Sequence, residues 1–484
     1  MNAEIVYHLP GKAPQRKLPR AYYWQRSERD KLIVAYASQN KKDTSITPML
    51  TWATIDLHTN SVQEQEILFI SDDTQSPIDV ETLQLAYDEM ENVWLLGILE
   101  FQSAIAEYHL VLRAIHKDRN RQIEAFHILF DDPANDMAAI GPLLMLETEN
   151  GLCYMMYLKP EQDYIATTTV ALAEIPLAGG QINHTVIDFA ESALVCKGKD
   201  MILMLSCTPE ILTGELLAKM QKEYDYSTYE WLYLLSGGKE YAEASWLHYL
   251  ERGIPVDKRA VPVDDLITGQ LVLSATAIAG PERPENGLPT FVASMIMMNA
   301  QHKPDEKYRI TAKTNIHEQV SRLLCIDAEG NLVQTYQGSI GLYPVLCRAR
   351  NHIVGVDLIG DQWRLWTWRP LEQATFDQLL LLDKEVQRAC VIVEDEPGQE
   401  DVCWLIEEYA DRVIISKRSA VTLEQVASPA VLSSVHLLLP QSGYGRLDWH
   451  TEVDALVHDD TMLLLAVDND DQLVLYRVKE EPRS

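Results

Sequence analysis

The residues with the clearest potential for chemistry are short runs of carboxylates, and the densest of these lies near the C-terminus. The run Asp468-Asn469-Asp470-Asp471 comes closest to a calcium loop, since Ca²⁺ prefers several oxygen ligands from one tight turn. It lacks the glycine and the distal glutamate of an EF-hand loop. Aspartate and asparagine also tolerate the unusual backbone angles of a hairpin turn. We therefore expect a turn here and no metal site.

Carboxylates from different parts of the chain could also meet in one channel and cleave glycosidic bonds as an acid and a base. Four further acidic pairs are available: Asp72-Asp73, Asp131-Asp132, Asp264-Asp265 and Asp459-Asp460. Nothing in the sequence selects one of them. The glycine-rich phosphate loops, the H-E-x-x-H zinc motif and the G-x-S-x-G nucleophile motif are absent from the sequence. The sequence therefore predicts no catalytic residue and no cofactor.

A run of aromatic residues offers a second kind of chemistry, the stacking of a flat ligand. In Trp363–Trp368, strand alternation places Trp366 and Trp368 on one face and Trp363 with Leu365 on the other. Such a run can bind a ligand or fill the space between two sheets. Large aromatic side chains most often serve as core, so we expect packing.

A segment rich in tyrosine gives the candidate interaction site. Residues 208–229 interrupt the surrounding pattern of strands, and their apolar residues have the spacing of a helix. Tyrosines beside such an insertion are good anchors for a protein partner, although they can equally pack within a loop. Five residues are therefore the candidate partner-binding residues: Leu216, Met220, Tyr224, Tyr226 and Tyr229.

The elements that would position these residues are short apolar strands joined by tight polar turns. Such units recur about every 50 to 65 residues, the spacing of large propeller blades. One clear unit pairs Lys31–Ser38 with Met49–Leu57, and another pairs Met462–Val467 with Gln472–Val478. The sequence predicts an all-β fold with residues 1–484 in one β-propeller of about eight four-stranded blades. Seven blades, or two stacked β-sandwich domains, are the alternatives.

The two ends of the chain suggest how such a ring closes. The last repeat has three strands and lacks a fourth, whereas Ile5–Leu9 is a single strand without a blade. Closure removes unpaired sheet edges, so we expect residues near Tyr7 to pair with residues near Leu475. The sequence predicts a linker at residues 11–20 and a loop at residues 302–317.

Composition limits the function classes. The chain has 484 residues with 72 acidic and 41 basic side chains, a formal net charge of -31. Such a charge repels phosphate, so we expect neither nucleic-acid nor anionic-membrane binding. The seven cysteines have no C-x-x-C spacing, the first residues lack the order of a signal peptide, and no apolar run reaches the length of a membrane span. These features favour a cytoplasmic protein with reduced thiols.

The repeat rhythm resembles that of divergent bacterial β-propellers and extends over nearly the whole chain. The Gly-His and Trp-Asp marks of WD40 repeats are missing. The chain also resembles the propeller members of bacterial multi-protein modules that accompany ATPases, von Willebrand-type domains, or caspase-like and CRISPR-linked defence proteins. This resemblance implies a non-enzymatic scaffold or regulatory subunit with protein partners. A ligand-sensing propeller, and a glycan hydrolase or lyase with a site at the channel mouth, are the alternatives.

Overall fold

The structure is a computed structural model. It describes residues 1–12, 21–28, 31–38, 49–68, 78–88, 93–102, 107–116, 122–129, 143–149, 151–160, 168–178, 180–190, 192–197, 202–207, 245–251, 254–260, 270–282, 290–299, 319–327, 332–341, 344–349, 352–393, 402–438, 455–458 and 461–480. Every regular element within these ranges is a β-strand, which confirms the predicted all-β class. The same ranges contain no helix with the length and apolarity that a membrane crossing requires.

The described strands form eight antiparallel sheets, seven of which use four consecutive strands each. The first sheet is β2 (Ala21–Glu28), β3 (Lys31–Ser38), β4 (Met49–Asp56) and β5 (Ser61–Leu68). The second is β6 (Ile78–Asp88), β7 (Val93–Gln102), β8 (Glu107–His116) and β9 (Gln122–Leu129). The third is β10 (Leu143–Glu149), β11 (Leu152–Pro160), β12 (Thr168–Pro176) and β13 (Asn183–Ala190). The fourth is β14 (Ser192–Lys197), β15 (Ile202–Cys207), β16 (Ser245–Glu251) and β17 (Ile254–Ala260).

The fifth, sixth and seventh sheets repeat this order. The fifth is β18 (Gln270–Glu282), β19 (Thr290–Asn299), β20 (Gln319–Asp327) and β21 (Leu332–Thr335). The sixth is β22 (Val345–Ala349), β23 (His352–Ile359), β24 (Gln362–Trp368) and β25 (Gln378–Leu381). The seventh is β26 (Arg388–Val393), β27 (Val402–Glu408), β28 (Arg412–Ser419) and β29 (Ala430–Ser433). The closing sheet contains β1 (Asn2–Lys12), β33 (Gln472–Lys479), β32 (Thr461–Asp468), β30 (Val435–Leu437) and β31 (Ala455–His458).

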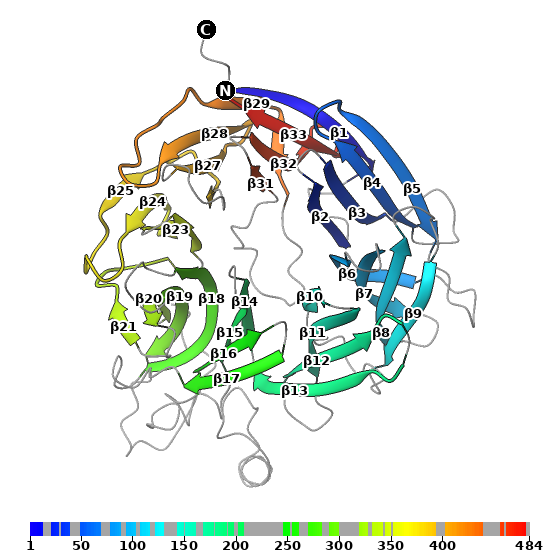
Figure 1. Cartoon of the computed structure of the whole chain (residues 1–484). Coiled ribbons are helices and arrows are strands. Elements are labelled where there is room, and N and C mark those ends of the chain that lie inside the picture. The colour runs from blue at the N-terminus through cyan, green and yellow to red at the C-terminus, as the bar shows by residue number, and fades with distance from the viewer. Residues whose placement is uncertain are drawn as a thin grey trace, which may run out of the picture.

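The sheets are arranged around a common centre. Figure 1 shows β2, β6, β10, β14 and β18 toward the centre, and β5, β13, β17 and β21 toward the outside. Successive sheets therefore pack face to face, and each middle strand is covered on both sides. This explains why β23 is buried at six consecutive positions. Radial packing of antiparallel sheets is the architecture of a β-propeller, as the repeat spacing predicted.

Aromatic and aliphatic side chains fill the spaces between neighbouring sheets. Trp366 and Trp368 face the fifth sheet, where they belong to one cluster with Val292. Trp363 faces the seventh sheet and belongs to a cluster with Leu405. Both faces of β24 are thus used for packing, as the alternation of its residues predicted. Trp366 and Trp368 are fully buried, so neither ring is open to a stacked ligand.

The two ends of the chain meet in the closing sheet. β1 pairs antiparallel with β33, and Tyr7 lies opposite Leu475, which confirms the predicted pairing. Glu4 on β1 accepts a hydrogen bond from Nε of Arg477 at 2.7 Å. Arg477 also donates to the carbonyl oxygen of Leu57 in the β4–β5 turn, so this arginine links the closing sheet to the first sheet.

β1 is longer than the Ile5–Leu9 strand that the sequence predicts. It continues through Gly11 and Lys12, because Lys12 still pairs with Gln472 of β33. These two residues belong to the strand and not to the predicted linker at 11–20. Residues 13–20 lie outside the described residues.

The chain from Ala430 to Leu437 forms two separate strands, β29 and β30. Ser434 has a φ of 61°, in the left-handed region, and its N–H donates to the carbonyl oxygen of Asp411 at 2.8 Å. The chain therefore turns between β29 and β30, and β30 leaves the seventh sheet to pair with β32. The closing sheet thus has five described strands, one more than predicted.

The acidic run at the C-terminal hairpin is a turn, as predicted. One carboxylate oxygen of Asp468 accepts the N–H groups of Asp470 and Gln472, both at 2.9 Å. Asp471 has a φ of 59°, which aspartate tolerates. The predicted insertion at 208–229 and the predicted loop at 302–317 lie outside the described residues.

Candidate functional site

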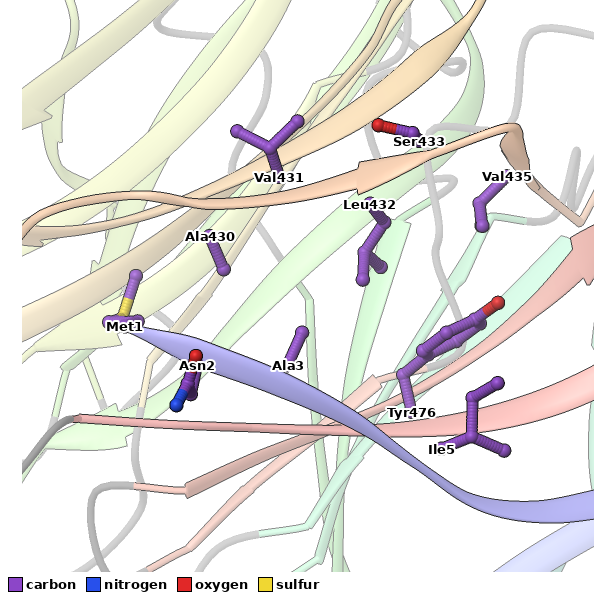
Figure 2. Close-up of a pocket in the computed structure, with 10 residues that line it drawn as sticks. All are labelled: Met1, Asn2, Ala3, Ile5, Ala430, Val431, Leu432, Ser433, Val435 and Tyr476. Atoms are coloured by element: carbon purple, nitrogen blue, oxygen red, sulfur yellow. The ribbon is translucent and has the colours of Figure 1, made fainter.

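A groove of about 480 Å³ separates the outer strand β1 from the outer strand β29. Figure 2 shows the side chains that line it, which come from β1, β29, β33 and the start of β30. They are Met1, Asn2, Ala3, Ile5, Ala430, Val431, Leu432, Ser433, Val435 and Tyr476. All ten side chains are uncharged, in a protein whose formal net charge is -31.

β29 supplies one wall. Its side chains alternate, so that Ala430 and Leu432 are buried toward the closing sheet whereas Val431 is half-exposed. Figure 2 shows Leu432 pointing toward Tyr476 and Val431 pointing away from β1. Within the described part of the chain, β29 pairs with β28 alone, so its other edge remains open. This wall therefore offers both apolar side chains and a free strand edge.

β1 supplies the opposite wall. Met1 and Ala3 pack against the cluster that contains Leu432, and Ile5 farther along is half-exposed at the mouth of the groove. The N-terminal ammonium group of Met1 donates to the carbonyl oxygen of Ser428 at 2.8 Å. This bond ties the first residue to the segment that leads into β29. The two walls are thus joined at one end of the groove.

Tyr476 of β33 lies between the walls. Its ring is buried, and burial together with the nearby charge of Asp468 raises the pKa of the phenol above its usual value. The hydroxyl is therefore protonated at neutral pH and can donate or accept one hydrogen bond. It makes no hydrogen bond to another described residue. Tyr476 is therefore positioned to give an apolar groove one directional contact.

Buried charges behind the groove fix the path of β30. Glu408 accepts the N–H of Leu437 at 3.1 Å, and Arg388 donates to the carbonyl oxygen of Leu438 at 2.8 Å. Arg388 also lies 3.6 Å from the Glu408 carboxylate, so both charges are compensated. These bonds hold the backbone just after Val435, and the bond from the Ser434 N–H to Asp411 holds it just before, so Val435 is fixed against the groove.

The lining limits what the groove can do. Covalent or acid–base catalysis needs ionisable side chains around a reacting atom, and this lining offers only the phenol of Tyr476. Across the described residues, no group of three or more metal-ligating side chains is present. The arrangement can bury apolar surface and form a few hydrogen bonds, which is the chemistry of binding.

The five partner-binding residues predicted from the sequence are not part of this groove's described lining. Leu216, Met220, Tyr224, Tyr226 and Tyr229 all lie outside the described residues. Sequence reasoning also missed the groove residues themselves. One signal pointed to them: a single N-terminal strand that completes the last sheet must be an outer strand, and outer strands have a free edge.

No known protein family matches the sequence, and no curated protein matches it either. Among solved structures, the chain is similar to the Dos1 propeller, with 9% identity, a TM-score of 0.46, and 98% of each chain covered. It is also similar to the WD40 domain of SCAP from fission yeast, with 8% identity and a TM-score of 0.49 over 99% of this chain and 98% of that one. A third similar structure is the polysaccharide lyase Uly1, with 8% identity and a TM-score of 0.41 over 93% of this chain and 88% of that one. Similarities at this level assign no function.

Proposed function

We propose that the protein is an interaction scaffold or regulatory subunit of a multi-protein complex, built as one ring of eight blades. Two observations support the ring: the described strands form eight sheets, and β1 completes the last of them by pairing with β33. In such a ring each blade keeps a free strand edge at its outer strand. A rigid ring of this kind is a suitable platform for binding other proteins.

The groove between β1 and β29 is the observation that carries the proposal. Two half-exposed aliphatic side chains border its mouth: Ile5 of β1, and Val431 of β29, which points away from β1. Tyr476 lies between the two walls. Burying such side chains contributes about 25 cal/mol per Å² of apolar surface. The occupant that fits is an extended, uncharged and mostly apolar segment of another protein. Binding of this segment, rather than turnover of a substrate, is the proposed activity.

The test uses the full-length protein with a substitution at the mouth of the groove. Partners are captured from native cells with the wild type, with Val431→Asp, and with Val421→Asp as the control. Val421 is also an exposed valine, and it does not line the groove. We expect a partner that binds the wild type and Val421→Asp equally, and whose purified form binds Val431→Asp at least tenfold more weakly.

Two results would contradict the proposal. In the first, no partner is recovered, or every recovered partner binds Val431→Asp as well as it binds the wild type. In the second, a metabolite or nucleotide raises the unfolding temperature of the wild type but not of Val431→Asp. The second result would favour a ligand-sensing propeller, because about 480 Å³ also lies in the size range of small-molecule sites.

A further inference from the structure

A second apolar surface lies on the outer strand of the sixth sheet. Leu379 and Leu381 of β25 are 51% and 59% exposed. The strand pairs with β24, and the described residues contain no other partner for it. Large aliphatic side chains on a free strand edge promote pairing with another chain, and soluble proteins normally avoid them. The exposed leucines of β25 therefore call for an explanation beyond the fold.

The outer edge of β25 also has free backbone hydrogen-bonding groups. The N–H of Leu382 donates to the carbonyl oxygen of Trp363 at 3.0 Å, which makes these two residues a hydrogen-bonded pair of the ladder. Hydrogen-bonded and non-bonded pairs alternate in an antiparallel ladder. The N–H and C=O groups of Leu380 therefore face β24, whereas the N–H and C=O groups of Leu379 and Leu381 point outward. The two exposed leucines thus also carry the free backbone groups.

The loop before β25 adds a third exposed leucine in a strained conformation. Leu371 has a φ of 73°, which costs energy for any residue with a Cβ, and its side chain is 54% exposed. Leu423 in the seventh sheet also has a positive φ of 60°, but it is 5% exposed and belongs to the core. The fold uses the side chain of Leu423 and leaves that of Leu371 in solvent. The Leu371 N–H donates to the Gln334 side chain, which holds the loop against β21.

The charges around β25 indicate what kind of chain it would accept. Residues 369–385 contain four acidic side chains and two basic ones. Arg369 is bound by Glu372 at 2.6 Å and by Asp377 at 2.9 Å. Asp383 and Glu385, just after the strand, are exposed and form no ion pair with another described residue. This local excess of negative charge favours a positively charged partner.

We propose that β25 binds an extended basic segment of another protein as an added antiparallel or parallel strand. The N–H and C=O groups of Leu379 and Leu381 form the main-chain bonds, and alternate apolar residues of the segment cover the two side chains. Leu371 is the anchor at the N-terminal end of the strand. Basic residues of the segment lie near Asp383 and Glu385. This site is separate from the groove between β1 and β29.

The test selects peptides from a random 12-residue library, displayed on phage, against the full-length protein. We expect enriched peptides with apolar residues at alternate positions and a net positive charge. Affinities of the synthetic peptides are then measured for the wild type and four variants. Three variants alter the proposed site: Leu379→Asn, Leu381→Pro and Leu371→Gly. The control is Val421→Asn, which changes an exposed valine elsewhere.

Each variant removes a different component of the site. Leu379→Asn removes apolar surface, and Leu381→Pro removes an outward N–H that the β24 ladder does not use. We expect both to weaken binding at least tenfold. Leu371→Gly removes the anchor and relieves the strained backbone, so binding weakens while the unfolding temperature stays the same or rises. N-methylation of alternate peptide amides abolishes binding, since it blocks the main-chain bonds.

Three results would overturn this proposal. One is a library that yields no peptide, and another is a set of peptides whose affinity is unchanged by the β25 variants. The third is a wild-type dimer in sedimentation that Leu381→Pro dissociates, which would make a second copy of this chain the occupant. Val431→Asp in the groove leaves peptide binding at β25 intact. Failure here is therefore distinguishable from failure of the proposed scaffold function.

Discussion

Gly355 lies directly opposite Trp366 in the antiparallel pairing of β23 with β24, and the indole ring of Trp366 covers the glycine. A Cβ atom at position 355 would meet the six-membered part of that ring well inside van der Waals contact. The ring also stacks on Phe376, with centroids 4.4 Å apart, so it has little freedom to move. The absence of a side chain at 355 is therefore what allows Trp366 to fill the space between the fifth and sixth sheets.

We expect Gly355→Ala to lower the free energy of unfolding by about 1–3 kcal/mol, because an added methyl group overpacks a rigid core. Urea unfolding followed by tryptophan fluorescence measures the loss. Trp366→Phe shortens the ring, so the double variant recovers part of the stability that Gly355→Ala loses. Additive effects of the two substitutions would show that the ring does not cause the loss.

Asp357 is the centre of a buried polar cluster in the sixth sheet. Its carboxylate is fully buried and accepts the N–H of Gly341 at 2.8 Å and Nε of Arg364 at 2.9 Å. Asp357→Asn leaves the guanidinium without its counter-charge, and we expect a loss of about 3 kcal/mol of unfolding free energy. The measurement is the shift of the urea midpoint.

The matched control is Asp411→Asn, which removes an exposed ion pair with Arg412. We expect it to change stability by less than about 1 kcal/mol, since exposed charges are screened by water. Equal losses for the buried and the exposed aspartate would contradict the role assigned to burial.

Glu407 makes stability depend on pH. Burial raises the pKa of its carboxyl group above the usual value; the charge of Arg418 opposes this rise, and that of Asp383 adds to it. The folded protein therefore holds the proton more tightly than the unfolded chain does. The stability that comes from this proton is present at low pH and is lost as pH rises from the unfolded pKa through the folded one.

The unfolding temperature of the wild type is expected to fall as pH rises above about 4.5, the ordinary pKa of a glutamate carboxyl group. We expect Glu407→Gln to make this fall smaller. Thermal unfolding at closely spaced pH values gives the two profiles. Glu424→Gln, at an exposed carboxylate, serves as the control and keeps the wild-type profile. A parallel offset of the Glu407→Gln profile, with no change in slope, would exclude this carboxyl group as the titrating one.

Two residues of β1 separate stability from binding. Leu9 is buried in the cluster between the closing sheet and the first sheet, whereas Ile5 is half-exposed at the groove. We expect Leu9→Ala to lower the free energy of unfolding by about 2–5 kcal/mol, since it leaves a cavity where β1 packs against the first sheet. Ile5→Ala is expected to cost less than about 1 kcal/mol but to weaken partner binding. Calorimetry and binding assays on the same samples distinguish the two effects.

The sequence alone determined where hairpins such as β32–β33 form, because a hairpin and its turn depend on neighbouring residues. Alternation of apolar residues and the polar turn at 468–471 were enough to place β32 and β33, and counting strands was enough to pair Tyr7 with Leu475. The same alternation assigned the two faces of Trp363–Trp368 correctly. Each of these features depends on residues within a few positions of one another or, for Tyr7 and Leu475, on the pairing of the first strand with the last.

Which surfaces stay open was decided only by the tertiary structure. The turn at Ser434 depends on a bond to Asp411, twenty-three positions earlier, and the groove exists because that turn sends β29 and β30 into different sheets. Leu379 and Leu423 are both leucines, yet one is exposed and one is buried. Exposure depends on which distant strands pack against a residue, and no local pattern of residues carries that information.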